Sequence, residues 1–132
     1  MPGIKLTVSG TPDDALSRRL ATEITSLTCA TLKKKRELTM VQIHYLPREQ
    51  WFIDQRSLVE HGKNSFRLKV TITEGTNTRG DKIAYHKRAF GLLSELIGNL
   101  HPHSNVHIID CGAVCYGYGG RTQEDRYNQQ PA

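Results

Sequence analysis

An internal repeat constrains the fold of this chain more than any other feature of its 132 residues. The segments "GIKLTV", from Gly3, and "FRLKVTIT", from Phe66, alternate apolar and polar residues, a pattern typical of half-buried strands. Each runs into a Gly-Thr turn and a helical pattern, and a second strand closes each unit, in "TMVQIHYL" and "NVHIIDC". The turns and second strands match at an offset of 65 residues and the first strands at 64. The sequence therefore predicts two copies of one unit, at about residues 2–62 and 65–125.

Helix signals follow both turns. In the first copy Thr11 can cap the helix, and Pro12 suits its first position because no backbone donor is needed there. In the second copy Thr78 or Asp81 is the expected start. The residues expected on the buried stripes are Leu16, Leu20, Ile24, Leu27 and Thr31 in the first helix, and Ile83, Phe90, Leu93, Ile97 and Leu100 in the second.

These units predict an α/β fold in a single domain over residues 1–132. A helix that connects two strands of one sheet makes those strands parallel and the crossover right-handed. Duplicated β-α-β units therefore form a two-layer sandwich, with a four-stranded mixed sheet and two helices on one face. Since the sequence supplies no further helix for the other sheet face, we expect the chain to self-associate.

Charge and composition argue against several classes of protein. No apolar run is long enough to cross a bilayer and no signal sequence is evident, so we expect a cytoplasmic protein without a membrane partner. Three cysteines, an odd number, favour reduced thiols. The net charge is +5, and residues 33–36 supply much of it. At a helix end these cations complement the macrodipole, and without a nucleic-acid motif we expect no nucleic-acid partner.

Pro2 stands at the start of the first strand, where a missing backbone donor costs little, and this alone can explain it. If Met1 is removed, however, Pro2 becomes a free secondary amine, which is a base and a nucleophile. A short loop after each second strand ends in an aromatic residue, Trp51 in "PREQWFID" and Tyr116 in "AVCYGYGG", again 65 residues apart.

Proline, duplication and the two aromatic loops together resemble the tautomerase superfamily, whose members are built from β-α-β units with an amino-terminal proline as base. The loops are similar to that of the 4-oxalocrotonate tautomerase group. The size resembles the fused members, such as malonate semialdehyde decarboxylase and macrophage migration inhibitory factor. The resemblance implies a homotrimer and a cofactor-independent isomerase that moves a proton in a small enol or conjugated keto acid. Pro2 would be the general base, and one site per chain is expected because Phe66 occupies the matching place in the second copy.

The family's carboxylate-binding arginines are missing from their usual places, which here hold Thr11, Met40 and His107. Arg79, in "EGTNTRGD", is the substitute that the resemblance implies, and Arg36 or Arg121 of a neighbouring chain is a further candidate. His107 is either a substrate contact or a structural histidine within a strand. Without the usual clamp, a substrate with one carboxylate is expected to react better than a dicarboxylate.

Aromatic residues complete the predicted site. We expect Ile4, Trp51 and Tyr116 to line an apolar pocket around Pro2, which would lower the pKa of its amine. Trp51 could stack on a flat conjugated substrate or pack in the core or an interface. Tyr116 and Tyr118 could donate a hydrogen bond to an enolate oxygen or pack the seam of a trimer.

Two alternative functions stay open. A Pro2 amine that remains cationic favours hydration, dehalogenation or decarboxylation, because it supplies a proton instead of removing one. A protein with this fold could also present a surface to a partner without catalysing a reaction. Cys111 and Cys115 with His107 match no standard zinc spacing, so we expect no metal and no cofactor.

Overall fold

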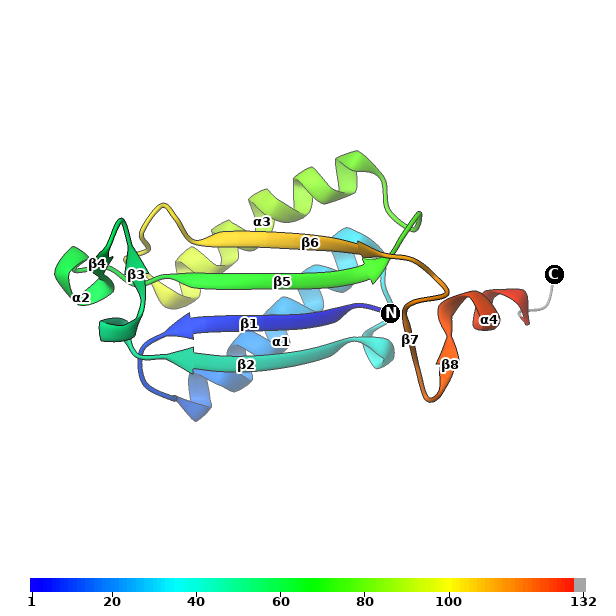
Figure 1. Cartoon of the computed structure of the whole chain (residues 1–132), viewed down its shortest axis with the longest axis horizontal. Helices are drawn as coiled ribbons and strands as arrows, with labels where there is room; N and C mark the ends of the chain where they lie inside the picture. The colour runs from blue at the N-terminus through cyan, green and yellow to red at the C-terminus, as the bar shows by residue number, and fades with distance from the viewer. Residues whose placement is uncertain (130–132) are drawn as a thin grey trace.

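The computed structural model describes residues 1–129 and has two layers, a four-stranded sheet and two long helices packed on one of its faces (Figure 1). The sheet contains β1 (Gly3–Ser9), β2 (Met40–Leu46), β5 (Phe66–Thr73) and β6 (Asn105–Cys111). The long helices are α1 (Asp14–Leu32) and α3 (Arg79–Ile97). The shorter elements are η1 (Arg36–Leu38), η2 (Arg48–Gln50), β3 (Phe52–Ile53), β4 (Arg56–Ser57), α2 (Leu58–His61), β7 (Gly117–Tyr118), β8 (Arg121–Thr122) and α4 (Gln123–Asn128).

β1 and β5 form the centre of the sheet, whose strand order is β2-β1-β5-β6. β1 pairs in parallel with β2, and β5 pairs in parallel with β6, while β1 and β5 are antiparallel. One long helix joins each parallel pair, α1 the first and α3 the second, and both helices lie on the same face (Figure 1). The predicted two-layer α/β sandwich with a mixed sheet is therefore confirmed.

The hydrophobic core lies between the sheet and the two long helices. Alternation directs one set of side chains from the central strands toward the helices. The members of this set are almost completely buried: Ile4, Leu6, Val8, Phe66, Leu68, Val70 and Ile72. Within the core, the hydroxyl groups of Tyr85 in α3 and Thr28 in α1 share a hydrogen bond of 2.8 Å. Burial raises the pKa of Tyr85 to about 12.

The start of α1 differs from the prediction, because Asp13 and not Thr11 caps this helix. The backbone of Asp13 is extended, and its carboxylate accepts a hydrogen bond of 3.0 Å from the Leu16 N–H. Pro12 therefore precedes the cap and does not occupy the first helical position. A carboxylate both satisfies a free helix donor and opposes the positive end of the helix dipole, which favours aspartate in this role.

The predicted stripe of the second helix is confirmed at Leu93, which is buried, and at Phe90, Ile97 and Leu100, which pack against the core, but it is wrong at Ile83. Tyr85, Ala89 and Leu93 recur every four residues and are completely buried. Ile83 lies two residues before Tyr85, about 200° around the helix. Its side chain is therefore directed away from the core and is 53% exposed. The start of this helix agrees with the prediction, since Thr78 caps it.

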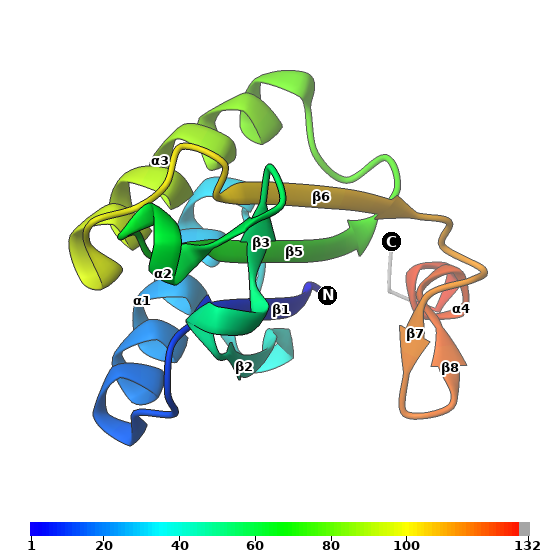
Figure 2. The same ribbon diagram turned by 60° about the vertical axis from the view of Figure 1, so that its left-hand side comes forward.

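A short hairpin and a short helix follow each parallel pair, with one set at each end of the sheet (Figure 2). The same backbone hydrogen bond closes both hairpins. Leu58 N–H donates to the Trp51 carbonyl (2.9 Å), and Gln123 N–H donates to the Tyr116 carbonyl (2.7 Å). The equivalent positions lie 65 residues apart. Because β1 and β5 run in opposite directions, equivalent hairpins lie at opposite ends of the molecule.

The two hairpin turns differ in sequence but not in backbone geometry. Gly119 and Gly120 form one turn with φ of 63° and 80°. Asp54 and Gln55 occupy the same places in the other turn with φ of 52° and 62°. A left-handed conformation costs a residue with a Cβ roughly 1–2 kcal/mol. The β3–β4 turn therefore carries strain that the β7–β8 turn avoids.

Candidate active site

A pocket of about 620 Å³ lies at the amino end of β1, between η1 and the β7–β8 hairpin. It extends over the sheet face that no helix covers. Pro2 and Ile4 contribute to its lining from the start of the chain, and Tyr116 and Tyr118 contribute from the hairpin. The pocket therefore joins residues that are more than a hundred positions apart in the sequence.

Pro2 is buried in this pocket. Its carbonyl accepts a hydrogen bond of 3.2 Å from the Met40 N–H, which fixes the start of β1 against β2. In the full chain the Pro2 nitrogen belongs to a peptide bond, and the free amine is that of Met1. Burial and, to a lesser degree, the charge of Lys34 lower the pKa of the Met1 amine from its ordinary value of 8.0. The surroundings of this end of the chain therefore favour an uncharged amine.

Lys34 is a residue that the sequence analysis did not single out. It follows the end of α1, where Lys33 adopts a left-handed conformation at the carboxyl-terminal cap. The Lys34 ammonium donates a hydrogen bond of 2.7 Å to the hydroxyl of Thr76, and burial lowers the pKa of Lys34. Lys34 belongs to a run of four basic residues, 33–36, and nothing in the sequence shows that it is the one whose charge acts on the amino terminus.

Tyr116 places a hydroxyl group beside the start of β1. Its oxygen lies 3.3 Å from the Thr71 carbonyl, to which it donates. A Cβ added at Gly3 would lie only 2.8 Å from the same oxygen, so the close approach requires glycine at this position. Burial and, next, the nearby Cys111 raise the pKa of Tyr116 above its ordinary value of 10.0, while the Gly3 backbone opposes these effects. Tyr116 is therefore protonated at neutral pH and can donate a hydrogen bond.

Tyr118 forms the outer wall of the pocket and is held from behind by Arg126. The Arg126 guanidinium lies 3.7 Å from the centre of the Tyr118 ring, and its Nη2 donates to the Tyr118 carbonyl at 2.8 Å. A cation stacked on an aromatic face and bonded to the same residue restricts the ring to one orientation.

Two lysines of the sheet line the same pocket. Lys5 of β1 and Lys69 of β5 stand directly opposite each other in the antiparallel pair. Among residues 1–129, no carboxylate lies within ion-pair distance of either ammonium group. Like charges directly opposite each other destabilise a sheet, and an anion between them removes that repulsion. Sequence reasoning had assigned both residues only to the polar side of a strand.

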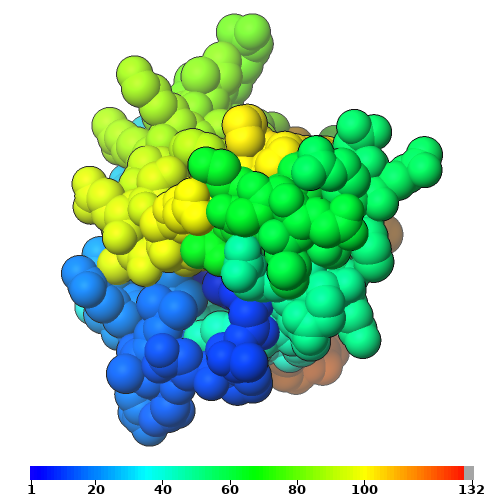
Figure 3. Space-filling view, turned by 90° about the vertical axis from the view of Figure 1, so that its left-hand side faces the viewer, coloured from blue at the N-terminus to red at the C-terminus, as the bar shows by residue number. Residues whose placement is uncertain are grey.

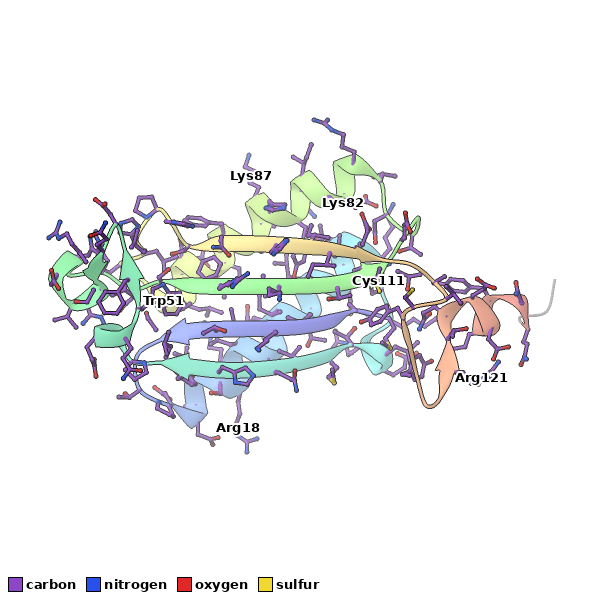
Figure 4. The ribbon with its side chains drawn as sticks, viewed as in Figure 1. Arg18, Trp51, Lys82, Lys87, Cys111 and Arg121 are labelled. Atoms are coloured by element: carbon purple, nitrogen blue, oxygen red, sulfur yellow. The ribbon has the colours of Figure 1, made fainter. Side chains whose placement is uncertain are left out.

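Within one chain Trp51 does not line the pocket around Pro2, whereas Ile4 and Tyr116 do line it. Trp51 belongs to the other hairpin, at the end of the sheet opposite to Cys111 and Arg121 (Figure 4). There it lines a second pocket. The antiparallel pairing of β1 and β5 causes this separation, because it sends the two aromatic loops to opposite ends of the sheet.

Three other predicted site residues lie outside the lining of the pocket. Arg79 is the exposed first residue of α3. His107 is exposed on β6, next to Lys69 in the sheet register. Arg36 is the exposed first residue of η1, although the following residues of that turn do line the pocket. Within one chain, the structure thus brings Pro2 and two tyrosines together and leaves these three side chains apart.

No cluster of three or more histidine, cysteine or acidic side chains that could hold a metal occurs in the described part of the chain. Cys29, Cys111 and Cys115 are free thiols. None of the helices over residues 1–129 has both the length and the apolar character that crossing a membrane requires.

No protein-family model matches this chain, and no curated protein matches it by sequence. Solved structures do match it. A native fused 4-OT has a TM-score of 0.81 and 20% identity, with 92% of this chain and 96% of that chain covered. Pt0534 inactivated by 2-oxo-3-pentynoate has a TM-score of 0.81 and 14% identity, with 92% and 97% covered. The wild-type symmetric trimer of Q0 fused 4-OT has a TM-score of 0.82 and 11% identity, with 94% and 98% covered. The chain therefore has the tautomerase superfamily fold.

Proposed function

We propose that this chain is a cofactor-independent isomerase that moves a proton within a small enol or conjugated keto acid, with Pro2 as the general base after removal of Met1. The observation that carries this proposal is the position of Pro2, buried in a pocket beside a protonated tyrosine and two lysines that have no carboxylate partner among residues 1–129. The likeness of the fold to fused 4-OT supports the same reaction class.

Proton transfer requires a Pro2 amine that is neutral at the working pH. Burial and the charge of Lys34 lower the pKa of the Met1 amine, and a Pro2 amine freed beside it would meet the same buried surroundings. A neutral Pro2 nitrogen can take a proton from the enol oxygen or from a carbon next to the carbonyl group. The same nitrogen then returns the proton to a second carbon or to oxygen, so the reaction needs no net proton exchange with solvent.

Tyr116 is the group we assign to the substrate oxygen. Negative charge develops on that oxygen while the proton is on Pro2, and the Tyr116 hydroxyl stabilises it when its single O–H turns from the Thr71 carbonyl to the substrate. This role requires that Tyr116 stays protonated, which agrees with its raised pKa. Gly3 keeps the hydroxyl close to the amino end of β1.

Lys5 and Lys69 are the cations we assign to the substrate carboxylate, in place of an arginine clamp. They belong to neighbouring strands and stand opposite each other, so they are suited to one carboxylate between them. An ammonium group attracts a carboxylate as a point charge, without the paired contacts of a guanidinium. A substrate with one carboxylate is therefore the expected class, since a second carboxylate would be buried without a partner.

We further propose a homotrimer in which the uncovered sheet faces point inward, as the trimeric form of fused 4-OT supports. Arg79, His107 and Arg36 reach the pocket of one chain only if a neighbouring copy contributes them. Light scattering tests this assembly directly, and a mass of one chain at micromolar concentration contradicts it.

Removal of Met1 gives a test of the proposed base. Protein shown by intact mass to begin at Pro2 is expected to turn over phenylenolpyruvate, and Pro2→Ala is expected to lose about a hundredfold or more. Protein shown to retain Met1 has an amide nitrogen at Pro2 and is expected to be inactive. Equal rates with and without Met1 exclude Pro2 as the base, and no turnover by either form favours a non-enzymatic role.

2-Oxo-3-pentynoate, which inactivates Pt0534, provides a second readout. A neutral Pro2 amine adds to the alkyne through a new N–C bond, and the adjacent alkyne carbon gains a proton. The protein mass then rises by the mass of the whole reagent, with the adduct on the amino-terminal peptide. A Pro2 amine that stays cationic does not add, so absence of the adduct favours the hydratase, dehalogenase or decarboxylase alternative.

A further inference from the structure

A second pocket, of about 490 Å³, lies at the other end of the sheet beside the β3–β4 hairpin. Figure 3 faces this end of the molecule, and the pocket is lined there by residues 50–54 of the hairpin region. We propose that this pocket binds small planar carboxylic acids through Arg67 and Trp51 and does not transform them. The proposal does not depend on Pro2 or on the removal of Met1.

The second pocket corresponds to the first through the two copies of the repeated unit, which we place at about residues 2–62 and 65–125. Trp51 takes the place of Tyr116, and both carbonyls accept the same hairpin-closing hydrogen bond. Thr7 lines the second pocket where Thr71 lines the first, 64 residues apart. The fold thus builds a similar cavity at both ends of the sheet.

The catalytic element is missing from the second pocket. The place of Pro2 is taken by Phe66, whose nitrogen is an internal amide and whose side chain is completely buried in the core. The place of Gly3 is taken by Arg67. Compared with the first pocket, the second pocket has no candidate base and has an additional cation, Arg67, which suits binding without proton transfer.

Arg67 supplies the anion-binding group. Its side chain is exposed on the uncovered sheet face, next to Thr7 and Asn105 in the register, and it lines the pocket. Over the described residues, its guanidinium forms no ion pair or side-chain hydrogen bond, and Asp54 in the same lining does not reach it. A free guanidinium binds a carboxylate through two parallel hydrogen bonds.

Aromatic side chains supply the apolar part of the site. Trp51 lines the pocket, and Phe52 beside it is 61% exposed, which is unusual for a phenylalanine. An indole face next to a guanidinium favours a ligand that is flat at one end and anionic at the other. An aryl or conjugated carboxylic acid has this shape.

Trp51 is the only tryptophan of the chain, so its fluorescence reports on this pocket and not on the pocket around Pro2. The probe is benzoate, and its uncharged amide, benzamide, is the control ligand. Benzoate is expected to change the Trp51 emission in a saturable way, both in protein that retains Met1 and in protein that lacks it. Benzamide is expected to bind at least tenfold more weakly, because it lacks the charge that Arg67 recognises.

Matched variants locate the response. Arg67→Gln removes an exposed charge without altering the core and is expected to weaken benzoate binding at least tenfold. Lys69→Gln lies on the same strand but lines the other pocket, and it is expected to leave the Trp51 response unchanged. The proposal is wrong if benzoate gives no saturable change, if benzamide binds equally well, or if Arg67→Gln binds as the parent does. A neighbouring copy that covers Trp51 would give the first of these results.

Discussion

Gly3→Ala tests the proposed role of Tyr116 with the smallest possible change. The added Cβ would lie 2.8 Å from the tyrosine oxygen, whereas ordinary contacts begin at 3.4 Å. The hydroxyl must therefore move by at least about 0.6 Å, since it is the end of a side chain and the strand backbone is held on both sides. Gly3 does not have a positive φ, so alanine causes no backbone strain.

The expected result separates activity from stability. A displacement of this size in a catalytic donor is expected to reduce kcat about 10- to 100-fold. Replacing a strand glycine by alanine also restricts the unfolded chain, which offsets the cost of the contact, so the free energy of unfolding is expected to change by less than about 1 kcal/mol. Kinetics with phenylenolpyruvate and urea unfolding of the same preparation measure the two effects, with intact mass confirming that both variant and parent begin at Pro2.

A double-mutant cycle with Tyr116→Phe decides whether the effect passes through the hydroxyl. If it does, Gly3→Ala in the Tyr116→Phe background has little further effect on kcat, because the group that it displaces is already absent. Additive losses refute this reasoning, as does a Gly3→Ala enzyme with the parent's kcat.

Three further predictions concern stability. The pKa of Tyr85 is about 12 in the folded protein against an ordinary value of 10.0, so stability that is fully present below pH 10 is expected to fall by roughly 2 kcal/mol as the pH rises to 12. Tyr85→Phe breaks the hydrogen bond to Thr28, but it should flatten this decline of the unfolding free energy with pH, as measured by urea unfolding. An unchanged dependence on pH would show that Tyr85 is not the titrating group. Thr78→Ala removes the capping box with Asp81 and should cost about 1 kcal/mol, and a loss below about 0.3 kcal/mol would show that the cap is not needed. Gln55→Gly should raise the melting temperature by relieving about 1 kcal/mol of left-handed strain, and a lower value contradicts that strain.

The sheet could be predicted from the sequence because the central strands alternate between a buried and a more exposed side and the edge strands repeat that pattern more weakly. β5, for example, alternates from Phe66 to Thr73, and its apolar set is the buried set. The details of the helices were less predictable. Asp13 competes with Thr11 for the cap, and only the backbone conformation decides between them. Ile83 fits a helical stripe by spacing, but the orientation of α3 is set by Tyr85, which packs against Thr28 of the other helix.

The candidate site was predictable only where it depends on one chain segment. Pro2 and Tyr116 could be proposed from the sequence because each belongs to a local pattern, and both line one pocket. Lys5 and Lys69 follow the same alternation as any solvent-facing strand residue, and only the antiparallel register and the hairpin over the open face make them part of a pocket. Within one chain Trp51 lies at the other end of the sheet from Pro2, which neither strand sequence shows, because the direction of β5 relative to β1 depends on how the strands pair.

The central seam between β1 and β5 has a consequence for synthesis of the chain. The first half leaves the ribosome with one edge of β1 unpaired, and that edge stays open until β5 has been made. The open β1 edges of two nascent chains on neighbouring ribosomes could then pair with each other instead of with β5. Because only a short linker between α2 and β5 separates the halves, the local concentration of the correct strand exceeds that of any other chain as soon as β5 emerges. Covalent connection of the halves therefore protects the nascent protein from aggregation at its most exposed edge.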